Sequence, residues 1–221
     1  MKALLQSGGG KDSILALYKV LNEYPDIEIE GMLVTITKDF NRVSMHGVRE
    51  KLVEEQAASL GLKIFKSYIP AQASNEIYIK STLDTLKEAM ERHGIEAVVF
   101  GDIFLEDIRL FRENLLKELE LRPIFPLWKM DSLKLADEFI SSGFRAVTVV
   151  VDLEKLSGEF LCREFNDDFI HSLPDSVDPM GENGEFHTFV YDGPIFRKQV
   201  KLRTGKFHSS GRFKFCDLTP E

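Results

Sequence analysis

Residues 2–15 read KALLQSGGGKDSIL, and this stretch decides the fold. Its first five residues predict a buried β-strand, and the apolar residues that recur at helical spacing from Ile14 onward predict a helix. The three glycines between them let the backbone turn sharply and leave room for an anion. The N–H groups of this turn, the first N–H groups of the helix and the Lys11 ammonium group would surround one point. A phosphate-binding loop is therefore expected at residues 7–13.

The spacing in this loop excludes two common phosphate-binding motifs. A Walker A loop has four residues between its first glycine and Gly-Lys-Ser/Thr, and here Lys11 is followed by Asp12. A dinucleotide-binding loop needs Gly-x-Gly-x-x-Gly, and no third glycine follows in register. The alternative without a ligand is a glycine-rich turn in which Asp12 or Ser13 caps the helix. Asp12 thus has two candidate roles, as a helix cap and as a ligand of a magnesium ion.

Strand and helix patterns alternate through the first half of the chain. Strands are expected at residues 2–6, 29–36, 62–69 and 97–100, with helices around residues 14–21, 47–60, 79–90 and 108–119. This alternation indicates right-handed βαβ units and a Rossmann-like parallel sheet of the HUP type with helices on both faces. Ligands bind at the carboxyl ends of such strands, so the loops after Gln6, Ile36 and Phe100 should lie on one rim.

The second half of the chain changes character. Residues 123–126 read PIFP, a rigid connector, Asp131 is expected to begin a helix, and residues 144–151 form a predicted strand. Glycine-punctuated β segments follow at residues 185–191, 196–202 and 212–216. We therefore expect an α/β nucleotide-binding domain at residues 1–125 and a smaller α+β acceptor domain at residues 126–221.

Composition limits the class of protein. The chain has 221 residues, with 28 Lys plus Arg against 36 Asp plus Glu, and its net charge of −8 disfavours nucleic acid as a partner. No apolar stretch reaches the roughly 20 residues that a membrane span needs, and no targeting segment is visible, so a cytoplasmic protein without membrane contact is expected. Cys162 and Cys216 are expected to be inert apolar residues. Their number and separation argue against a disulfide scaffold, a Cys-x-x-Cys zinc site and thiol-based sulfur transfer.

The sequence GGKDS after an N-terminal strand resembles the pyrophosphate loop of the ATP pyrophosphatases, also called adenine nucleotide alpha hydrolases. The resemblance implies that this loop holds the β and γ phosphates of ATP while an acceptor attacks the α phosphorus and pyrophosphate leaves. That superfamily usually has Ser where this chain has Gly8, and Ser7 stands one place earlier. The serine hydroxyl is therefore either missing or supplied by Ser7.

Three later segments narrow the family. GDI at residues 101–103, PLW at 126–128 and GENGEFHT at 181–188, together with the loop, resemble the diphthine–ammonia ligase family over nearly the whole chain. The resemblance implies that ATP activates an acceptor carboxylate as an acyl-adenylate, and that ammonia then displaces AMP to form an amide. It also implies that the acceptor is a modified histidine of a translation elongation factor.

The chain departs from the usual family residues at positions that bear on the acceptor. Asn183 stands where a second glycine is usual, His187 stands in place of Glu, and Asp102 replaces a small residue. Glu106-Asp107 stands where the ligases have an Asp-Tyr-Gln run. Residues 44–49, SMHGVR, also resemble a branch of shorter family members whose acceptor is not established.

The resemblance and the residue chemistry together assign the candidate site residues. The catalytic candidates are Lys11, Asp12, Asp102, Glu182 and Glu185, and the metal candidates are Asp12 and Asp102. The ATP-binding candidates are Gly8, Gly9, Gly10, Lys11, Asp12, Ser13, Thr35, His46 and Gly101. The acceptor-binding candidates are Arg109, Trp128, Gly184 and His187.

Several of these residues have a purely structural alternative. Gly101-Asp102 can be a plain turn after a strand, and Trp128 can belong to the core. Glu182 and Glu185 can be solvated carboxylates of a turn, and His187 can be a hydrogen-bonded structural histidine. Arg109 can pair with Glu106 or Glu113 on its own helix instead of binding an anion. These alternatives are left to the structure.

The expected cofactors are ATP and Mg²⁺, with the adenine against the strand edge at residues 34–36. No nucleophile suited to glutamine hydrolysis is apparent, so ammonia would arrive free or from another protein. Two other functions compete with the ligase. One is an ATP- or AMP-binding module without turnover, and the other is an enzyme that adenylates a different small-molecule or tRNA acceptor. A homodimer is a further open expectation.

Overall fold

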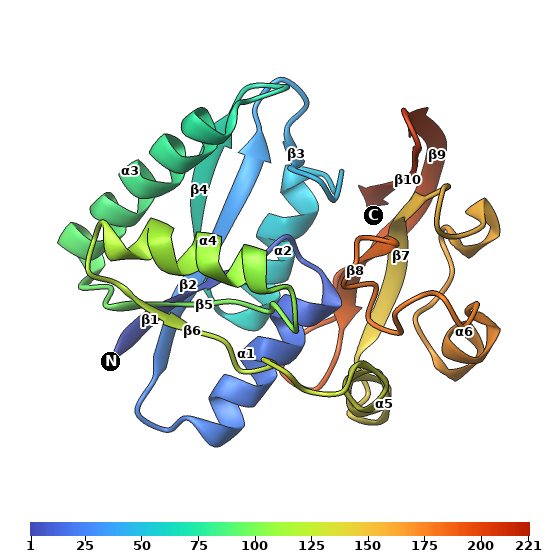
Figure 1. Cartoon of the computed structure of the whole chain (residues 1–221), viewed down its shortest axis with the longest axis horizontal. Helices are drawn as coiled ribbons and strands as arrows, with labels where there is room; N and C mark the ends of the chain where they lie inside the picture. The colour runs from blue at the N-terminus through green and yellow to red at the C-terminus, as the bar shows by residue number, and fades with distance from the viewer.

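Two β-sheets lie side by side in the computed structural model, which describes all 221 residues (Figure 1). The first half of the chain forms one sheet and its helices, in the order β1 Lys2–Gln6, α1 Lys11–Glu23, β2 Glu28–Thr37, β3 Arg42–Val43, α2 Glu50–Leu60, β4 Lys63–Ile69, α3 Asn75–His93, β5 Ala97–Val99, α4 Glu106–Lys117 and β6 Arg122–Ile124. β1 pairs in parallel with β2 and β5, β2 with β4, and β5 with β6, whereas the short β3 runs antiparallel to β2. The predicted parallel α/β sheet is therefore confirmed.

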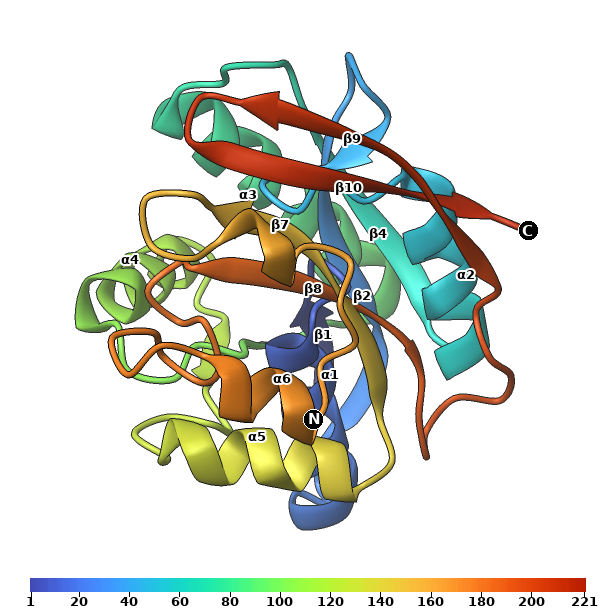
Figure 2. The ribbon, with the colours of Figure 1, turned by 90° about the vertical axis from the view of Figure 1, so that its right-hand side faces the viewer.

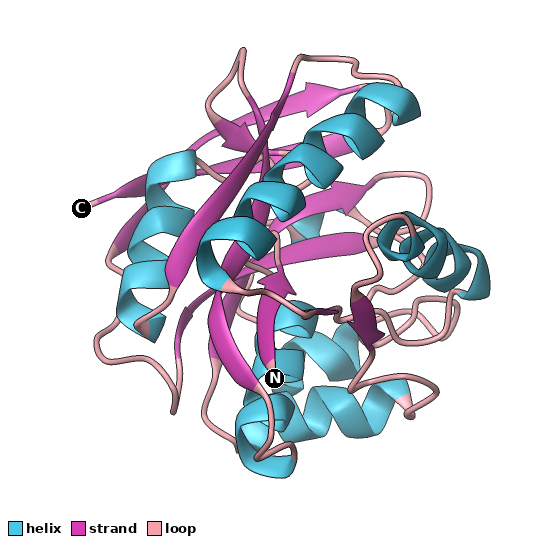
Figure 3. Ribbon diagram, turned by 90° about the vertical axis from the view of Figure 1, so that its left-hand side faces the viewer, coloured by secondary structure: helices cyan, strands magenta, loops and turns pink.

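Helices cover both faces of this sheet because side chains of a strand point alternately to its two sides. Leu4 of β1 packs in a small core with residues of α3 and α4, the face seen in Figure 3. Ala3 and Leu5, its neighbours, belong to the large core with residues of α1 and α2. The short apolar strands of the sequence are thus buried on both sides, as expected for a parallel sheet.

The second half of the chain forms an antiparallel sheet in the order β8-β7-β10-β9 (Figure 2). Its elements are α5 Ser132–Ser141, β7 Arg145–Asp152, a 3₁₀ turn Gly158–Phe160, α6 Asp167–Ser172, β8 Phe186–Asp192, β9 Leu202–Ser210 and β10 Phe213–Pro220. α5 begins where predicted, since the Asp131 carboxylate accepts a hydrogen bond from the Lys134 N–H at 2.9 Å.

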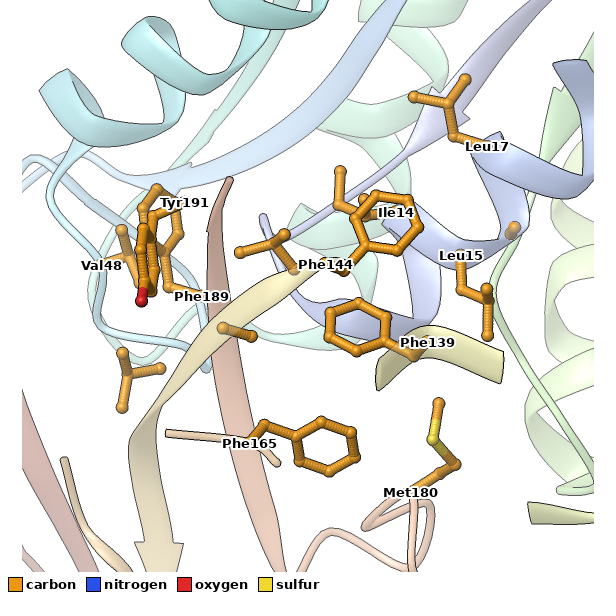
Figure 4. Packing of buried hydrophobic residues seen from close by; sticks show 14 of the residues in the cluster. Ile14, Leu15, Leu17, Val48, Phe139, Phe144, Phe165, Met180, Phe189 and Tyr191 are labelled. Atoms are coloured by element: carbon orange, nitrogen blue, oxygen red, sulfur yellow. The ribbon is translucent and has the colours of Figure 1, made fainter. Parts of the chain in front are cut away.

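One apolar core of 44 buried residues joins the two sheets. Helix α1 lies between them, and its Ile14 and Leu15 lie among Phe139, Phe144 and Phe165 of the second half (Figure 4). This packing fixes α1, and with it the glycine loop before α1, against the second sheet. The domain boundary at residue 125 stays a prediction.

Two sequence predictions about strands are wrong. Pro123 and Ile124, expected to begin a rigid connector at residues 123–126, belong to the edge strand β6 Arg122–Ile124. The Arg122 N–H and the Ile124 carbonyl form hydrogen bonds with residues on the β5 side of the strand. Pro123 has no N–H to donate, but that N–H would point to the open edge of the sheet, where no partner strand needs it. Residues 196–202 do not form a separate strand, because Arg197 N–H and Lys198 N–H bond to Ser59 at the end of α2.

The expectation of two inert thiols is also wrong, since Cys162 and Cys216 form a disulfide. Their Cα atoms are 6.2 Å apart, although 54 residues separate them in sequence. The bond ties β10 to the loop that follows the 3₁₀ turn. The two cysteines are far apart in the sequence, but β10 pairs with β7, and this pairing brings Cys216 close to Cys162.

None of the helices combines the length and the apolar character needed to cross a membrane.

Candidate functional site

A chamber of about 300 Å³ lies at the carboxyl ends of β1, β2 and β5, on the rim predicted from the sequence. The predicted site residues that line it are Gly8, Gly10, Asp12, Ser13, Thr35, His46, Gly101, Asp102, Glu182 and His187. The first sheet supplies most of this wall, and the second half of the chain supplies Glu182 and His187. Residues almost 180 positions apart in the sequence thus face one space.

The N–H groups of the glycine loop divide into two sets. Gly9 N–H donates to Ser7 Oγ at 2.9 Å, and Lys11 N–H donates to Thr188 Oγ1 of β8 at 3.1 Å. The N–H groups of Gly8, Gly10 and Ser13 have no acceptor, and these three residues line the chamber. Free N–H groups at a helix N-terminus attract an anion. The loop therefore presents the chemistry that a phosphate group requires.

The loop is held from behind by the second sheet and by α2. Gly9 carbonyl oxygen accepts hydrogen bonds from the Val190 N–H of β8 at 2.9 Å and from the Gln56 amide at 3.0 Å. The same Gln56 amide donates to the Val190 carbonyl at 2.6 Å. Together with the Lys11–Thr188 bond, these contacts fix the loop backbone before any ligand arrives.

The missing serine at position 8 has a structural explanation. A Cβ atom at Gly8 would lie 2.5 Å from His46 Cε1, so the imidazole occupies the space that a side chain there would need. Ser7 lines the chamber, but its hydroxyl is already engaged, because it bonds to Ser13 Oγ at 2.7 Å and accepts from Gly9 N–H. The predicted cap of α1 is not formed either, since Gly10 is the N-cap and has no side-chain cap.

Lys11 lies beneath the loop and not on the chamber wall. Its side chain is 1% exposed, and its Nζ lies 3.2 Å from Asp12 Oδ2. The ammonium group also lies 4.8 Å from the ring centre of Phe186 and 5.6 Å from that of Phe165. These rings and one carboxylate compensate the buried charge. The positive charge of Lys11 therefore lies next to the loop without lining the chamber.

Three carboxyl groups gather at the chamber, those of Asp12, Asp102 and Glu182. Burial raises the pKa of Asp12 and of Asp102, and it raises the pKa of Glu182 to about 7, with the charge of Asp12 as the next cause. Glu182 is held by the Ile103 N–H, which donates to its Oε1 at 2.7 Å. Crowded carboxyl groups of this kind favour the arrival of a cation.

Two carboxylate oxygens of this group are suited to a metal ion. Asp12 Oδ1 and Asp102 Oδ2 are buried and have no hydrogen-bond partner. The chain contains no group of three or more His, Cys, Asp or Glu residues arranged to hold a metal by themselves. Magnesium commonly takes one or two carboxylates and completes its shell with phosphate oxygens and water. The donors present therefore fit Mg²⁺ that arrives with a nucleotide.

Tyr78 of α3 and Arg112 of α4 are polar residues of the chamber wall that sequence reasoning missed. Arg112 Nη1 donates to the Tyr78 hydroxyl at 3.0 Å, and its Nε lies 3.8 Å from Asp102 Oδ2 without forming a hydrogen bond. Neither residue belongs to a motif. One sequence feature could have indicated Arg112. The helix that follows Gly101 must pack back against its own strand, and this packing brings one basic residue of α4 to the chamber.

Five predicted residues lie outside the chamber wall besides Lys11. Gly9 lies in the loop behind it, Gly184 faces open space, and Glu185 is buried and bonds to the Asp178 N–H at 3.2 Å. Arg109 and Trp128 line a separate surface pocket, with the guanidinium group 4.6 Å from the Trp128 ring centre. Arg109 bonds to Glu113 at 2.7 Å, which is the salt bridge left open above.

His46 and His187 form an aromatic pair at one end of the chamber. Their ring centres are 4.6 Å apart. Burial lowers the pKa of His46 to about 4 and that of His187 well below its usual range, so both imidazoles are neutral at pH 7. His187 also lines a second, larger chamber on its other side. His187 thus borders both cavities, whereas His46 lines only the first.

The parallel sheet, the phosphate-type loop and the acidic rim define the class of nucleotide-binding α/β proteins that the sequence motifs indicated. Comparison with known families gives the particular family. The chain matches the diphthamide synthase N-terminal domain over residues 1–123 and the diphthamide synthase C-terminal domain over residues 131–219. The chain therefore belongs to the diphthamide synthase family, and the predicted family is confirmed.

Individual relatives carry the name diphthine–ammonia ligase. The rat protein is 26% identical over 238 residues, a match that covers 96% of this chain and 88% of the relative. The zebrafish protein is 29% identical over 144 residues, covering 62% of this chain and 54% of the relative. The fission yeast protein is 26% identical, and the match covers 96% of this chain but 38% of that longer relative.

Proposed function

We propose that this protein is an ATP-dependent ligase that adenylates an acceptor carboxylate and then forms an amide with ammonia. One observation supports the proposal above all. Gly8, Gly10 and Ser13, whose N–H groups have no acceptor, line the chamber together with Asp12 and Asp102, each of which has one buried carboxylate oxygen without a hydrogen-bond partner. An anion and its metal ion fit between these two sets of groups. The names of the relatives support the same chemistry.

In the first step, an acceptor carboxylate oxygen forms a bond to the α phosphorus of ATP, and the bond from that phosphorus to the bridging oxygen breaks. Pyrophosphate leaves with the electron pair. The loop N–H groups hold the negative charge of the departing group, and Lys11 adds positive potential from beneath. Asp12 and Asp102 would hold Mg²⁺, which neutralises phosphate charge when it is bound.

In the second step, ammonia attacks the carbonyl carbon of the adenylate, and AMP leaves as the amide forms. The nitrogen loses a proton in this step. The pKa of Glu182 is raised to about 7, which suits a group that accepts a proton near neutral pH. Glu182 lines the chamber and is held by Ile103, so it is the proposed base.

The acceptor is proposed to be the modified histidine of a translation elongation factor, which is the acceptor that the resemblance to the diphthine–ammonia ligases implies, and the relatives carry that ligase name. A different small-molecule or tRNA acceptor is the alternative, and the departures at Asn183 and His187 favour it. We place the acceptor side in residues 126–221, because Glu182 and His187 enter the chamber from there.

Product analysis tests the proposal. The protein is incubated with MgATP, ammonium and an elongation factor that carries diphthine, and the products are separated. We expect AMP, pyrophosphate and conversion of the acceptor acid to an amide by mass spectrometry. Release of ADP and phosphate would contradict adenylation. ATP–pyrophosphate exchange with other carboxylates but not with the elongation factor would favour the different acceptor. Tight ATP binding without exchange for any acceptor would favour a binding module.

A further inference from the structure

The nucleotide chamber has a single cationic side chain on its wall, that of Arg112 of α4. Lys11 lies beneath the loop, and burial lowers the pKa of both histidines on the wall, so that these are neutral at pH 7. The three carboxyl groups described above make up the rest of the charged wall. The mechanism proposed above uses Arg112 in neither step. This guanidinium group therefore has no role yet.

The Arg112 guanidinium group is held in place but has donors to spare. Its Nη1 donates to the Tyr78 hydroxyl at 3.0 Å. Its Nε is buried and forms no hydrogen bond, because Asp102 Oδ2 lies 3.8 Å away, which is too far for one. Asp102 is also a proposed ligand of Mg²⁺, so its charge does not serve Arg112 alone. A buried N–H without a partner is unfavourable, and an anion that enters the chamber would satisfy it.

Two aromatic rings fix the position of the guanidinium group. Its central carbon lies 5.2 Å from the ring centre of Phe100 and 6.0 Å from that of Phe111. The Phe111 ring centre also lies 6.2 Å from that of Tyr78, so the rings and the guanidinium group form one cluster. An arginine that is packed in this way loses little conformational freedom when it binds an anion, and this favours affinity.

Tyr78 supplies a second donor at the same place. Its hydroxyl oxygen accepts the hydrogen bond from Arg112, and its proton is donated to no group of the protein. A phenol that accepts through its oxygen keeps its own proton free to donate. Both residues line the chamber, so a free N–H of a charged group and a free O–H are neighbours on its wall. Two such donors are suited to an oxyanion.

The position of this pair suits a second anion. Arg112 and Tyr78 come from α4 and α3, on one face of the first sheet, whereas the glycine loop leads into α1 on the other face (Figure 3). The proposed reaction brings two anions into one chamber, the triphosphate of ATP and the carboxylate of the acceptor, and these repel each other. The free N–H groups of the loop suit the triphosphate. A cationic subsite for the carboxylate would offset the repulsion.

We propose that Arg112 and Tyr78 form a second oxyanion subsite, which holds the reacting carboxylate of the acceptor while the glycine loop holds the triphosphate. The occupant assigned to the subsite rests on the proposed function. The pyrophosphate end of ATP has the same oxyanion chemistry and is the alternative source, so the experiment separates the two. A carboxylate is common to all acceptors of such an enzyme. The subsite therefore serves the reaction and leaves the choice among acceptors to other residues.

Four variants test the subsite. Arg112→Met removes the charged donors and keeps an unbranched side chain, and Arg112→Lys keeps the charge but loses the planar set of donors. Tyr78→Phe removes only the second donor. Arg92→Met is the matched control, because Arg92 is an exposed arginine of α3 that pairs with Glu88 and lines neither chamber. Thermal unfolding shows whether each variant keeps the fold.

The acceptor arm compares an elongation factor that carries diphthine with the same factor after conversion to the amide. We expect the natural chain and Arg92→Met to bind the acid form about tenfold more tightly than the amide form, and Arg112→Met to bind both alike. Amidation by Arg112→Met should show kcat/KM for the factor about tenfold lower, with Arg112→Lys in between and Tyr78→Phe about threefold lower. Calorimetric affinities for ATP and pyrophosphate should stay within about twofold in all variants.

Acetate tests the subsite independently of the acceptor. The NMR signal of the Arg112 Nε–Hε group, assigned by its absence from Arg112→Met, is followed in the full chain with Mg²⁺ and ATP present. Addition of acetate should shift this signal, and acetamide, which has the same shape without the charge, should not. Tyr78→Phe should need about threefold more acetate for the same shift.

Two outcomes would overturn the subsite: an Arg112 signal that acetate leaves unchanged, or a preference for the acid form that survives Arg112→Met. A tenfold loss of ATP and pyrophosphate affinity in Arg112→Met, with the preference for the acid form retained, would assign the oxyanion to the nucleotide and overturn the carboxylate. Failure of the natural chain to amidate the factor would contradict the proposed function instead. The acetate titration would then still decide whether the Arg112–Tyr78 pair binds a carboxylate.

Discussion

The two halves of this chain build their parts of the site with different chemistry. The first half contributes backbone N–H groups and the carboxylates of Asp12 and Asp102, each of which has one oxygen without a hydrogen-bond partner. The second half contributes side chains, Glu182 and His187 to the small chamber and the aromatic rings of β9–β10 to the large one. Backbone groups bind any phosphate in the same way, whereas side chains determine which molecule is bound. Under the proposed function, the first half would therefore bind the nucleotide and the second half would select the acceptor.

The largest effect is expected where the first half packs most closely. A Cβ atom at Gly101 would lie 2.6 Å from the Asp12 carbonyl carbon, which is backbone and cannot move aside. Gly101→Ala should push α1 away from β5 and weaken ATP binding by about a hundredfold, corresponding to the upper part of the usual overpacking cost. Calorimetric titration with ATP checks this, and Gly158→Ala, far from the chamber, is the control. An affinity within twofold of the natural chain would show that the N–H arrangement does not depend on this contact.

A tenfold effect on ATP affinity is expected at Gly8, where the phosphate-type loop meets the His46 side chain. Gly8→Ala should weaken ATP binding about tenfold, because the new methyl group collides with the His46 ring. The double variant Gly8→Ala/His46→Ala should recover most of that loss, since the smaller residue makes room. A double-mutant cycle on ATP affinity measures the coupling. Additive effects would mean that His46 does not explain the glycine at position 8.

The carboxylate oxygens of Asp12 and Asp102 that lack a hydrogen-bond partner lead to a prediction about how ATP affinity depends on Mg²⁺. Asp102→Asn should weaken ATP binding about tenfold when Mg²⁺ is present, because one of the two proposed ligands loses its charge. Without Mg²⁺ the same variant should bind ATP at least as well as the natural chain, since a repelling charge is gone. Parallel titrations with and without chelator give both values. An equal loss in both conditions would rule out a metal role for Asp102.

The lowered pKa of His46 leads to a prediction about how the stability of the fold depends on pH. The pKa of His46 is lowered to about 4 from a usual value of 6.5, so between these pH values the unfolded chain takes up a proton that the folded chain excludes. The stability that this group contributes is complete above pH 6.5 and falls as the pH decreases toward 4. Thermal unfolding at pH 7 and pH 5 should show a drop that is a few degrees smaller in His46→Asn. The exposed His171→Asn is the control and should keep the full drop.

The smallest effect is expected at Arg109, outside both chambers. Its guanidinium group bonds to Glu113 and lies over Trp128 on the surface. Arg109→Met should change ATP affinity by less than about twofold, as is usual for an exposed salt bridge. Calorimetry checks this with the same protocol. A larger loss would mean that the surface pocket of Arg109 and Trp128 takes part in binding, which would contradict a site confined to the chamber.

The sequence predicted the first half better than the second. Alternating apolar patterns placed every long strand and helix up to residue 120, and the rule that ligands bind at strand ends placed the chamber. β6 was missed because Pro123 is tolerated at a sheet edge, and β9 was misplaced because residues 196–202 bond to the end of α2. Both errors involve contacts between segments that are far apart in the sequence, and the periodicity of apolar residues carries no information about such contacts.

The candidate site divides in the same way. The loop motif identified Gly8, Gly10 and Ser13, whose backbone geometry is local. It could not show that Lys11 lies beneath the loop or that His46 fills the space beside Gly8, because both depend on packing against other elements. Arg112 and Tyr78 were missed for the same reason.

The hydrogen bonds between the glycine loop and β8 would couple the binding of the two proposed substrates. Gly9 and Lys11 are bonded to Val190 and Thr188, so the loop and β8 cannot shift independently without breaking these bonds. His187 belongs to the same strand and borders the second chamber. An acceptor that displaces β8 must therefore alter the affinity for nucleotide, and thermodynamic linkage requires nucleotide to alter the affinity for that acceptor by the same factor. Cooperative binding of the two substrates would then need no moving domain.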